Sequence, residues 1–495
     1  MFSLSLMKTI IVGAGVGSLG LSIRLALQGH EVEVYEANDY PGGKLHQFEL
    51  GRFRFDGGPS LFTMPQYMTE LFELAGRHPK DYFEYDKLDE ACRYFWEDGT
   101  QLKGYSDPKR FTEEASQVLG VPSEVIQEYF DYAENIYQHS GKIFLEKSLH
   151  KIDTWLSKET LASMLKIAQF DLFKSMNRAN KIRLGEPHLV QLFNRFATYN
   201  GSNPYRAPGI LNVIPWFEHG FGTFAPKGGM IEIPNSLHRL AKDLGVKFHF
   251  NAPVDEITYN KRKATGIKSG GNIFQADTVV SNADVFFTYK KLLPNLKAPE
   301  KKLNQERSSS AVVFYWGLHK SFDELGLHNI LFSDNYKSEF ESIFDKKELP
   351  EDPTVYINIS SKTNSSDAPD GGENWFVMIN APSHTGQDWD SETQKLKARV
   401  IKKINRILKC DVSKLIVEER IWTPQGIEED TRSYQGALYG TSSNDQMAAF
   451  LRHPNFSNLL DNLYFCGGSV HPGGGIPLAL LSAKITAEMI THGQA

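Results

Sequence analysis

Residues 8–36 read KTIIVGAGVGSLGLSIRLALQGHEVEVYE. A short apolar run at 9–12 precedes a glycine-rich turn over 13–18, and a second apolar run follows at 31–35. Leucine and isoleucine alternate with period two over 19–27, as in a half-buried strand, but the glycine turn before them and Gly29 after them favour a helix. The stretch therefore predicts a strand, a turn, a helix over 19–28 and a second strand, the unit that binds dinucleotides.

The small residues of this turn suit a pyrophosphate. Gly13 permits the tight turn, Gly15 lets the backbone approach the phosphates, and Ser18 keeps the helix close to the strand. The phosphates would then meet the N-terminus of the helix, where unpaired N–H groups favour negative charge. Glu36 ends the second strand, where it can bind a ribose hydroxyl and would repel a 2′-phosphate. The pattern indicates FAD or NAD and disfavours NADP.

Composition limits the class of protein and its partners. A chain of 495 residues exceeds what one hydrophobic core usually serves, so two or three joined domains are expected. The 32 Phe, 20 Tyr and 7 Trp supply rings for a core or for an apolar ligand. A net charge of -6 gives no electrostatic reason to expect nucleic acid. Only Cys92, Cys410 and Cys466 are present, which argues against a disulfide scaffold and a Cys-rich metal site and favours a reducing cytoplasm.

The sequence contains no segment expected to cross a membrane. No apolar run approaches the roughly 18 to 20 residues that a spanning helix needs. The N-terminal sequence MFSLSLMKTIIVGAG looks briefly like a signal peptide, but Lys8 interrupts the apolar stretch and glycines stand where a cleavage site would be. We interpret it as the first strand.

A basic amphipathic stretch lies within a mostly helical region over 110–200. Apolar residues recur at helical spacing from Leu161 to Leu172, with lysines and arginines among and after them. Two interpretations stay open: a helix packed on the core with a solvated face, and a helix that lies on a membrane surface.

The turn after Glu36 separates FAD from NAD. It reads Pro41-Gly42-Gly43-Lys44, and it resembles the two glycines and basic residue that glutathione-reductase-like flavoproteins carry at this place. Such a turn would provide a close backbone approach and a cation near the pyrophosphate. The resemblance favours FAD.

Three further stretches extend the resemblance to a particular family. They are Phe55-Asp56-Gly57-Gly58-Pro59-Ser60, Ser281-Asn282-Ala283-Asp284, and the C-terminal run from Gly467 to Pro477. Together they resemble the phytoene desaturase family of carotenoid desaturases and isomerases, almost from end to end of the chain. Amine oxidases, the nearest flavin relatives, usually carry an Asp where this chain has Gly468. Carotenoid desaturases resemble this chain in lacking it.

The resemblance implies a fold and a set of cofactor contacts. The fold is α/β, with a Rossmann-like FAD-binding domain of the glutathione-reductase type, a mixed-sheet substrate domain and a helical membrane-facing region. Val254 would contact the adenine through its backbone, and the last glycine turn would present N–H groups to the isoalloxazine end. The implied FAD-contacting residues are Gly13, Gly15, Gly17, Ser18, Glu36, Gly43, Lys44, Pro59, Ser60, Val254, Gly468, Gly475, Ile476 and Pro477.

The same resemblance suggests how the chain divides. Residues 1–80, 225–300 and 455–495 would form a discontinuous FAD-binding domain. Residues 81–110 and 301–454 would form the substrate domain, and residues 111–224 the helical region that faces substrate and membrane.

The implied activity is desaturation of an acyclic carotenoid by hydride transfer to flavin N5, while a proton leaves the neighbouring carbon. No Ser-His-Asp, metal-ligand or paired-carboxylate pattern is visible, so no catalytic residue is assigned. Weak acid/base candidates are Asp131, Glu218, His219 and His471. Some relatives carry other residues at the positions of Glu134 and Asn364. This difference puts in doubt that an acid/base role of those relatives applies to this chain. It also favours a later desaturation step over an early one.

Several alternatives stay open. Within desaturation, phytoene-type desaturation competes with 3,4-desaturation of a hydroxylated acyclic carotenoid. A carotenoid cis-trans isomerase that uses reduced FAD, and a lipid-carrying chaperone on the same fold, as in GDP-dissociation inhibitors, are the other two. A carotenoid cannot cross the cytoplasm unaided, so we expect a cytoplasmic protein attached peripherally to the membrane, with oxygen or quinone as the electron acceptor.

Overall fold

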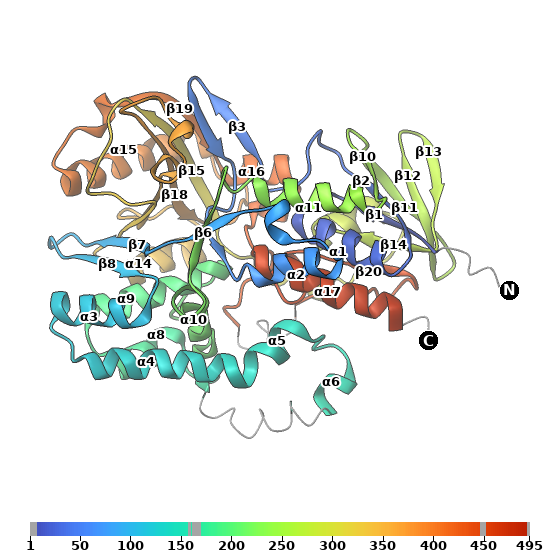
Figure 1. Cartoon of the computed structure of the whole chain (residues 1–495), viewed down its shortest axis with the longest axis horizontal. Helices are drawn as coiled ribbons and strands as arrows, with labels where there is room; N and C mark the ends of the chain where they lie inside the picture. Colours follow the sequence, from blue (N-terminus) through green and yellow to red (C-terminus); the bar gives the residue numbers. More distant parts are fainter. Residues whose placement is uncertain (1–6, 157–159, 161–169, 446–451, 493–495) are drawn as a thin grey trace.

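The computed structural model describes residues 7–156, 160, 170–445 and 452–492. Figure 1 shows three regions. A parallel sheet with its helices lies on the right, beside both ends of the chain, and a mixed sheet with one long helix lies at the upper left. A group of helices lies at the lower left, below the mixed sheet. The domain bounds expected from the sequence stay a prediction.

The parallel sheet has five strands in the order β10-β2-β1-β14-β20. Every neighbouring pair is parallel, so the carboxyl ends of all five strands meet at one edge. The strands predicted at 9–12 and 31–35 are confirmed as β1 (Lys8–Val12) and β2 (Glu31–Tyr35), and the other three strands are β10 (Lys247–His249), β14 (Thr278–Ser281) and β20 (Leu463–Phe465).

Different layers cover the two faces of this sheet, because side chains alternate across each strand. Ile11 and Val34 pack against helices, whereas Ile10 and Tyr35 pack against an antiparallel meander. The helices are α1 (Val16–Leu27), α2 (Gln66–Leu74), α11 (Glu232–Asp243) and α17 (Ile476–His492). The meander strands are β11 (Val254–Asn260), β12 (Lys263–Ser269) and β13 (Asn272–Gln275).

The segment with period-two leucines is helical, as predicted, and α1 begins at Val16 rather than at Leu19. Leu19, Leu21, Ile23 and Leu25 are all fully buried. Helix α1 contacts α2, α11 and α17 as well as β2, so apolar side chains are needed around its whole circumference. This surrounding explains why the leucines do not follow the usual one-sided helical pattern.

The mixed sheet has seven strands in the order β19-β15-β18-β17-β16-β7-β8. Only the β16–β7 pair is parallel. The bounds are β7 (Glu90–Phe95), β8 (Gln101–Tyr105), β15 (Ser310–Leu318), β16 (His328–Leu331), β17 (Val355–Asn358), β18 (Glu373–Ala381) and β19 (Ile416–Trp422).

The two faces of the mixed sheet have different neighbours. Phe314 and Trp316 of β15 pack against the long helix α15 (Trp389–Leu408), through residues such as Val400. Ala311 and Val313 alternate with them and point to the opposite face, where they pack with Phe376 and Ile427 and form a wall of the cavity described below.

Most of region 111–224 is helical, as the sequence predicts. Residues 161–169 of the amphipathic stretch lie outside the described residues, whereas Phe170 and Leu172 at its end are buried. Among the described residues, no helix combines the length and the apolar character that crossing a bilayer requires. The helices here are α3 (Pro108–Leu119), α4 (Ser123–Ile136), α5 (Lys142–Glu146), α6 (Ile152–Leu156), α8 (Met176–Leu184), α9 (Pro187–Asn194) and α10 (Ile214–His219).

Shorter elements connect the three regions. They form a two-stranded hairpin and a small three-stranded antiparallel sheet. The strands are β3 (Gln47–Leu50), β4 (Phe53–Asp56), β5 (Phe62–Thr63), β6 (Tyr85–Lys87) and β9 (Thr223–Pro226). The remaining short helices are α12 (Val285–Phe287), α13 (Glu300–Leu303), α14 (Tyr336–Glu341) and α16 (Pro424–Thr431).

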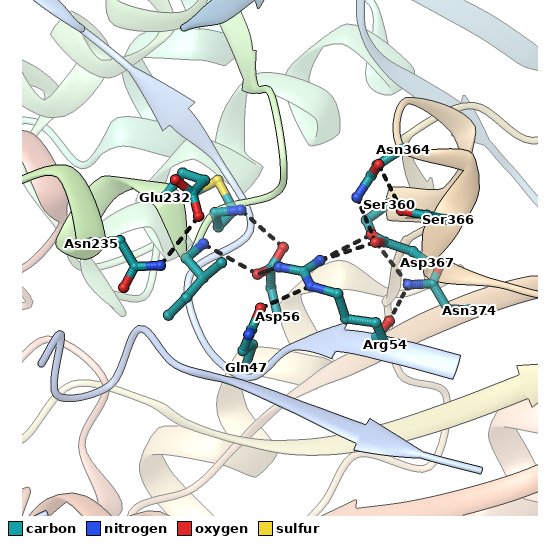
Figure 2. A network of polar contacts seen from close by, with 12 residues as sticks. Gln47, Arg54, Asp56, Glu232, Asn235, Ser360, Asn364, Ser366, Asp367 and Asn374 are labelled. Atoms are coloured by element: carbon teal, nitrogen blue, oxygen red, sulfur yellow. Dashed lines mark hydrogen bonds and ion pairs between the residues drawn. The ribbon is translucent and has the colours of Figure 1, made fainter. Parts of the chain in front are cut away.

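A buried polar network ties β4 to the loop after β17, to β18 and to the residues just before α11 (Figure 2). The guanidinium group of Arg54 lies between two carboxylates, 2.8 Å from Asp56 and 3.1 Å from Asp367. Asp56 accepts the backbone N–H groups of Met230 and Ile231, just before α11. Asp367 also accepts a hydrogen bond from Asn364 at 2.6 Å. Asn364 therefore has a structural role in this network.

We predict that Asp367→Asn lowers the free energy of unfolding by about 3 kcal/mol or more. The carboxylate of Asp367 is fully buried, and its partners are all hydrogen-bond donors. An amide at this position would direct its NH₂ group at one of those donors and would leave Arg54 with only one carboxylate partner. Urea denaturation measures the change. Asp131→Asn, on the exposed face of α4, is the control and should shift stability by less than about 0.5 kcal/mol. Equal effects of the two variants would contradict the role given to the network.

Candidate functional site

One large cavity lies between the carboxyl edge of the parallel sheet and the face of the mixed sheet opposite α15. Its volume is about 1250 Å³. Pockets for single small ligands usually measure about 300 to 1,000 Å³, so this cavity has room for more than one. Its wall combines the glycine turn after β1, the end of β2, the 42–44 turn, residues of β15 and β18, and the turn before α17.

The glycine turn after β1 is held in place by backbone and amide hydrogen bonds. Gly13 has a φ of 91° and donates its N–H to the carbonyl of Tyr35 at 2.7 Å. The N–H of Gly15 donates to Asn282 Oδ1 at 3.1 Å, and Asn282 Nδ2 donates to the carbonyl of Cys466 at 2.9 Å. A Cβ at Gly15 would lie 2.5 Å from Asn282 Oδ1. Only glycine fits here, and Asn282 joins the ends of three neighbouring strands.

Glu36 is positioned by two backbone N–H groups. Its Oε2 accepts from Ala14 at 2.6 Å and its Oε1 accepts from Asn38 at 2.9 Å. A carboxylate has about four acceptor positions, so one remains on each oxygen for hydroxyl groups in the cavity. This arrangement fits the predicted binding of a ribose.

The turn at Gly42 and Gly43 lies against the first glycine turn. Gly42 donates its N–H to the carbonyl of Ala14 at 2.9 Å, and a Cβ at Gly43 would lie 3.4 Å from the Cα of Gly15. Lys44 Nζ donates to the carbonyls of residues 437 and 438, at 3.3 and 3.0 Å. Burial lowers the pKa of Lys44 to about 8.

The last glycine turn brings the N-terminus of α17 to the cavity. Gly467 and Gly475 have φ values of 109° and 115°, which non-glycine residues rarely adopt. A Cβ at Gly468 would approach the Cα of Gly474 to 3.2 Å. The helix α17 starts at Ile476, and its first N–H groups have no acceptor within the helix. This turn can therefore supply N–H donors to a bound group.

Thirteen of the fourteen residues predicted to contact a cofactor line this one cavity. Ser18 does not. It is fully buried inside α1, and its small side chain fits the close packing around that helix. Whether the thirteen contact a cofactor stays a prediction. The structure nonetheless brings together residues from both ends of the chain.

A buried polar cluster forms another part of the cavity wall. Arg195, Tyr199, Glu218, His328 and Tyr356 all line the cavity, and they come from four separate segments. The sequence analysis singled out only Glu218 among them. None of the others belongs to a recognisable motif, and the contacts that bring them together lie far apart in the chain.

The four weak acid/base candidates lie in different surroundings. Asp131 is on the exposed face of α4. His219 is buried, with Nδ1 at 3.1 Å from the carbonyl oxygen of Tyr105, and does not line the cavity. His471 is buried too, its Nε2 lies 2.9 Å from the carbonyl oxygen of Lys147, and burial lowers its pKa to about 4. Of the four, only Glu218 lines the cavity.

The residues present fit FAD. The glycine turn opens a helix, as pyrophosphate binding requires, and Gly13, Gly15 and Gly43 place backbone without side chains at the cavity wall. Glu36 keeps free acceptor positions for a ribose, and the turn before α17 offers N–H donors. All these groups line the same cavity.

Comparison with known proteins agrees with this geometry. A model of the flavin containing amine oxidoreductases matches residues 21–491. The chain belongs to the flavin containing amine oxidoreductase family. As a member of this flavin family it is an FAD-dependent oxidoreductase, and its fold is mixed α/β.

Two curated relatives match the chain over nearly its whole length. A 1-hydroxycarotenoid 3,4-desaturase of Flavobacterium sp. (strain P99-3) is 51% identical over 99% of this chain and 100% of the relative. A 4,4'-diapolycopene oxygenase of Methylomonas sp is 32% identical over 98% of each chain. These relatives confirm the resemblance to the carotenoid desaturases.

Solved structures support this fold. A putrescine oxidase with bound putrescine has a TM-score of 0.63 and 15% sequence identity, and the match covers 98% of this chain and 99% of that one. At this identity the likeness concerns the fold alone.

We predict that FAD affinity depends on the protonation of Lys44. A nearby pyrophosphate would favour the charged amine of Lys44. The affinity for FAD should therefore be constant below pH 8 and should fall above it, by up to about tenfold per pH unit. Titration of the apoprotein with FAD, followed by flavin fluorescence, measures this dependence.

The variant Lys44→Arg tests whether Lys44 causes this pH dependence. Arginine stays protonated up to the highest usable pH, so its affinity should stay constant through pH 8. Lys227→Arg, which exchanges an exposed lysine paired with Glu84, is the control and should behave as the parent protein does. A parent affinity that does not change above pH 8 would show that Lys44 does not contact the phosphates.

Proposed function

We propose that this protein is an FAD-dependent desaturase that forms the 3,4 double bond of a 1-hydroxylated acyclic carotenoid. The observation that carries the proposal is the 51% identity, along the full length of both chains, to a protein described as a 1-hydroxycarotenoid 3,4-desaturase. The shape of the cavity supports the same substrate class.

The cavity has an apolar wall opposite the predicted cofactor site. Ala311 and Val313 of β15 and Phe376 and Met378 of β18 contribute to it. An apolar wall of this kind suits a polyene, because burying apolar surface is favourable by about 25 cal/mol per Å². The cavity is larger than a pocket for a single ligand, so it has room for a substrate chain beside the cofactor.

Desaturation removes a hydride from one carbon and a proton from its neighbour. FAD, when bound, accepts the hydride, and an acceptor of the oxygen or quinone class must then take up both electrons. The protein has to hold the reacting C–H within about 3 to 3.5 Å of its acceptor and keep water away. The apolar strands β15 and β18 serve the second need. We propose the thirteen predicted cavity residues as the FAD contacts.

We also propose the division into units expected from the sequence. The strands of the parallel sheet come from residues 8–35, 247–249, 278–281 and 463–465, which supports one discontinuous FAD-binding unit over 1–80, 225–300 and 455–495. The mixed sheet supports a substrate unit over 81–110 and 301–454, and the helices support a third unit over 111–224.

The helical unit is proposed to attach to the membrane surface. Exposing a 40-carbon chain to water costs about 30 kcal/mol at 0.8 kcal/mol per carbon, so the substrate must come from a bilayer. Leu156, Phe173 and Ile182 are exposed by 68%, 82% and 64%, and all three belong to this unit. Arg178 and Lys181 are exposed beside Ile182 on α8, where they can meet anionic lipid headgroups.

We predict that the FAD-loaded protein converts a 1-hydroxylated acyclic carotenoid in liposomes to a product lighter by two hydrogens. Mass spectrometry of the extracted pigments measures it. An unchanged mass with altered retention would instead indicate an isomerase, and conversion of phytoene alone would indicate an early-step desaturase. Failure to convert any carotenoid in a panel would contradict the proposed function.

We predict that the double variant Phe173→Asp and Ile182→Asp no longer sediments with anionic liposomes at low salt. Charged side chains at these positions oppose insertion of the exposed apolar face. The control is the double variant Ile273→Asp and Val417→Asp, which places the same charges on exposed apolar residues of β13 and β19. Loss of binding in the control, or none in the test variant, would contradict this membrane face.

A further inference from the structure

We propose that the polar cluster in the cavity wall, made of Arg195, Tyr199, Glu218 and His328, binds the hydroxyl group on C1 of the substrate. By holding that hydroxyl, the cluster would select the carbon–carbon bond that reaches the cofactor. The inference rests on the proposed function and identifies the end of the substrate that this part of the site recognises.

Arg195 and Glu218 form the centre of the cluster. The guanidinium of Arg195 donates to the hydroxyl of Tyr94 at 3.0 Å and to that of Tyr199 at 3.2 Å. It lies 3.5 Å from Glu218 Oε1, and the hydroxyl of Tyr199 donates to the other oxygen of Glu218. The side chains of Arg195 and Glu218 are 9% and 3% exposed. These contacts fix the orientation of both charged groups.

Three polar atoms of the cluster lack a hydrogen-bond partner among the described residues. They are Glu218 Oε1, Arg195 Nε and His328 Nε2, and all three are buried. Buried polar groups in folded proteins nearly always have partners, because leaving them without one destabilises the fold. The three atoms are enclosed within the cluster, whereas other parts of the same three side chains line the cavity, so a ligand hydroxyl must displace part of the cluster to supply the missing partners.

His328 is arranged to donate to such a ligand. Asn358 Nδ2 lies 3.2 Å from His328 Nδ1 and has only donors to offer, so Nδ1 acts as the acceptor and the ring proton lies on Nε2. Burial lowers the pKa of His328 to about 4, which keeps the ring neutral. Glu218 and Arg195 are close enough to shift that pKa in opposite directions.

An alcohol matches these groups. A hydroxyl has one donor and two acceptor positions, so it can donate to the carboxylate of Glu218 and accept from an N–H of His328 or Arg195. An unsubstituted hydrocarbon end would leave the same groups unpartnered. The cluster therefore favours a hydroxylated chain end over a bare one.

The position of the cluster suits oxidation at C3 and C4. The hydroxyl of Tyr356 lies 2.8 Å from His328 Nδ1 and 2.7 Å from Ser60 Oγ, and Ser60 is one of the proposed FAD contacts. In a 1-hydroxylated chain, two carbon–carbon bonds of about 1.5 Å separate C1 from C3. A group that binds the C1 hydroxyl must therefore lie close to the cofactor, as this cluster does through Tyr356 and Ser60.

The test compares two substrates that differ only at C1. One is the hydroxylated acyclic carotenoid, and the other is the same chain with hydrogen in place of the hydroxyl. We expect the parent enzyme to prefer the hydroxylated chain. In Glu218→Gln and in Tyr199→Phe, kcat/KM for the hydroxylated chain should fall about 10- to 100-fold, mainly through KM, while the deoxy chain changes by about twofold or less.

The control is Glu373→Gln. Glu373 is a buried carboxylate paired with Lys362, and it does not line the cavity. This variant should affect both substrates equally. Flavin content and thermal unfolding of each variant identify any that fail to fold, and the conservative Tyr199→Phe variant keeps the ring in place.

Equal losses on both substrates in Glu218→Gln and Tyr199→Phe would overturn the inference, and a loss in kcat alone would point to proton transfer instead. A parent enzyme that converts both substrates equally well would overturn it too, while leaving the proposed desaturase activity intact. A parent enzyme that converts neither substrate would contradict the proposed function itself.

Discussion

The close approach of backbone segments at the carboxyl edge of the parallel sheet is the constraint on which the site depends. A Cβ at Gly15 would lie 2.5 Å from Asn282 Oδ1, and one at Gly43 would lie 3.4 Å from the Cα of Gly15. Asn282 also holds the carbonyl of Cys466. Segments that are hundreds of residues apart in the chain therefore form one continuous cradle, and this cradle has the features that a flavin dinucleotide requires.

The second sheet supplies the wall of the cavity opposite the cradle. Side chains alternate along β15, so Phe314 and Trp316 pack against α15 whereas Val313 lines the cavity. One strand therefore contributes both to a hydrophobic core and to the ligand-facing surface. The network around Arg54 joins the loop after β17 to the start of α11. It thereby fixes how the apolar wall faces the cradle, and this spacing determines what can lie between them.

The sequence was sufficient wherever a local pattern determines the structure. The strands around Gly13 and the helix after it follow from the apolar period and the glycine turn. The helix α15 was not predicted, although Leu396, Val400 and Ile404 recur at helical spacing. The partners of Arg195 could not be predicted, since its contacts with Tyr94 and Glu218 join separate elements and follow no motif.

Bound FAD should take its electrons directly from a hydroxylated carotenoid held in this cavity. The decisive experiment is a single turnover without oxygen, in which FAD-loaded protein is mixed with the 1-hydroxylated substrate. The visible flavin absorbance should fall as the substrate is added, with one new double bond formed for each flavin reduced. Two results would contradict direct electron transfer to FAD. In one, product forms while the flavin absorbance does not fall; in the other, neither the flavin nor the substrate changes.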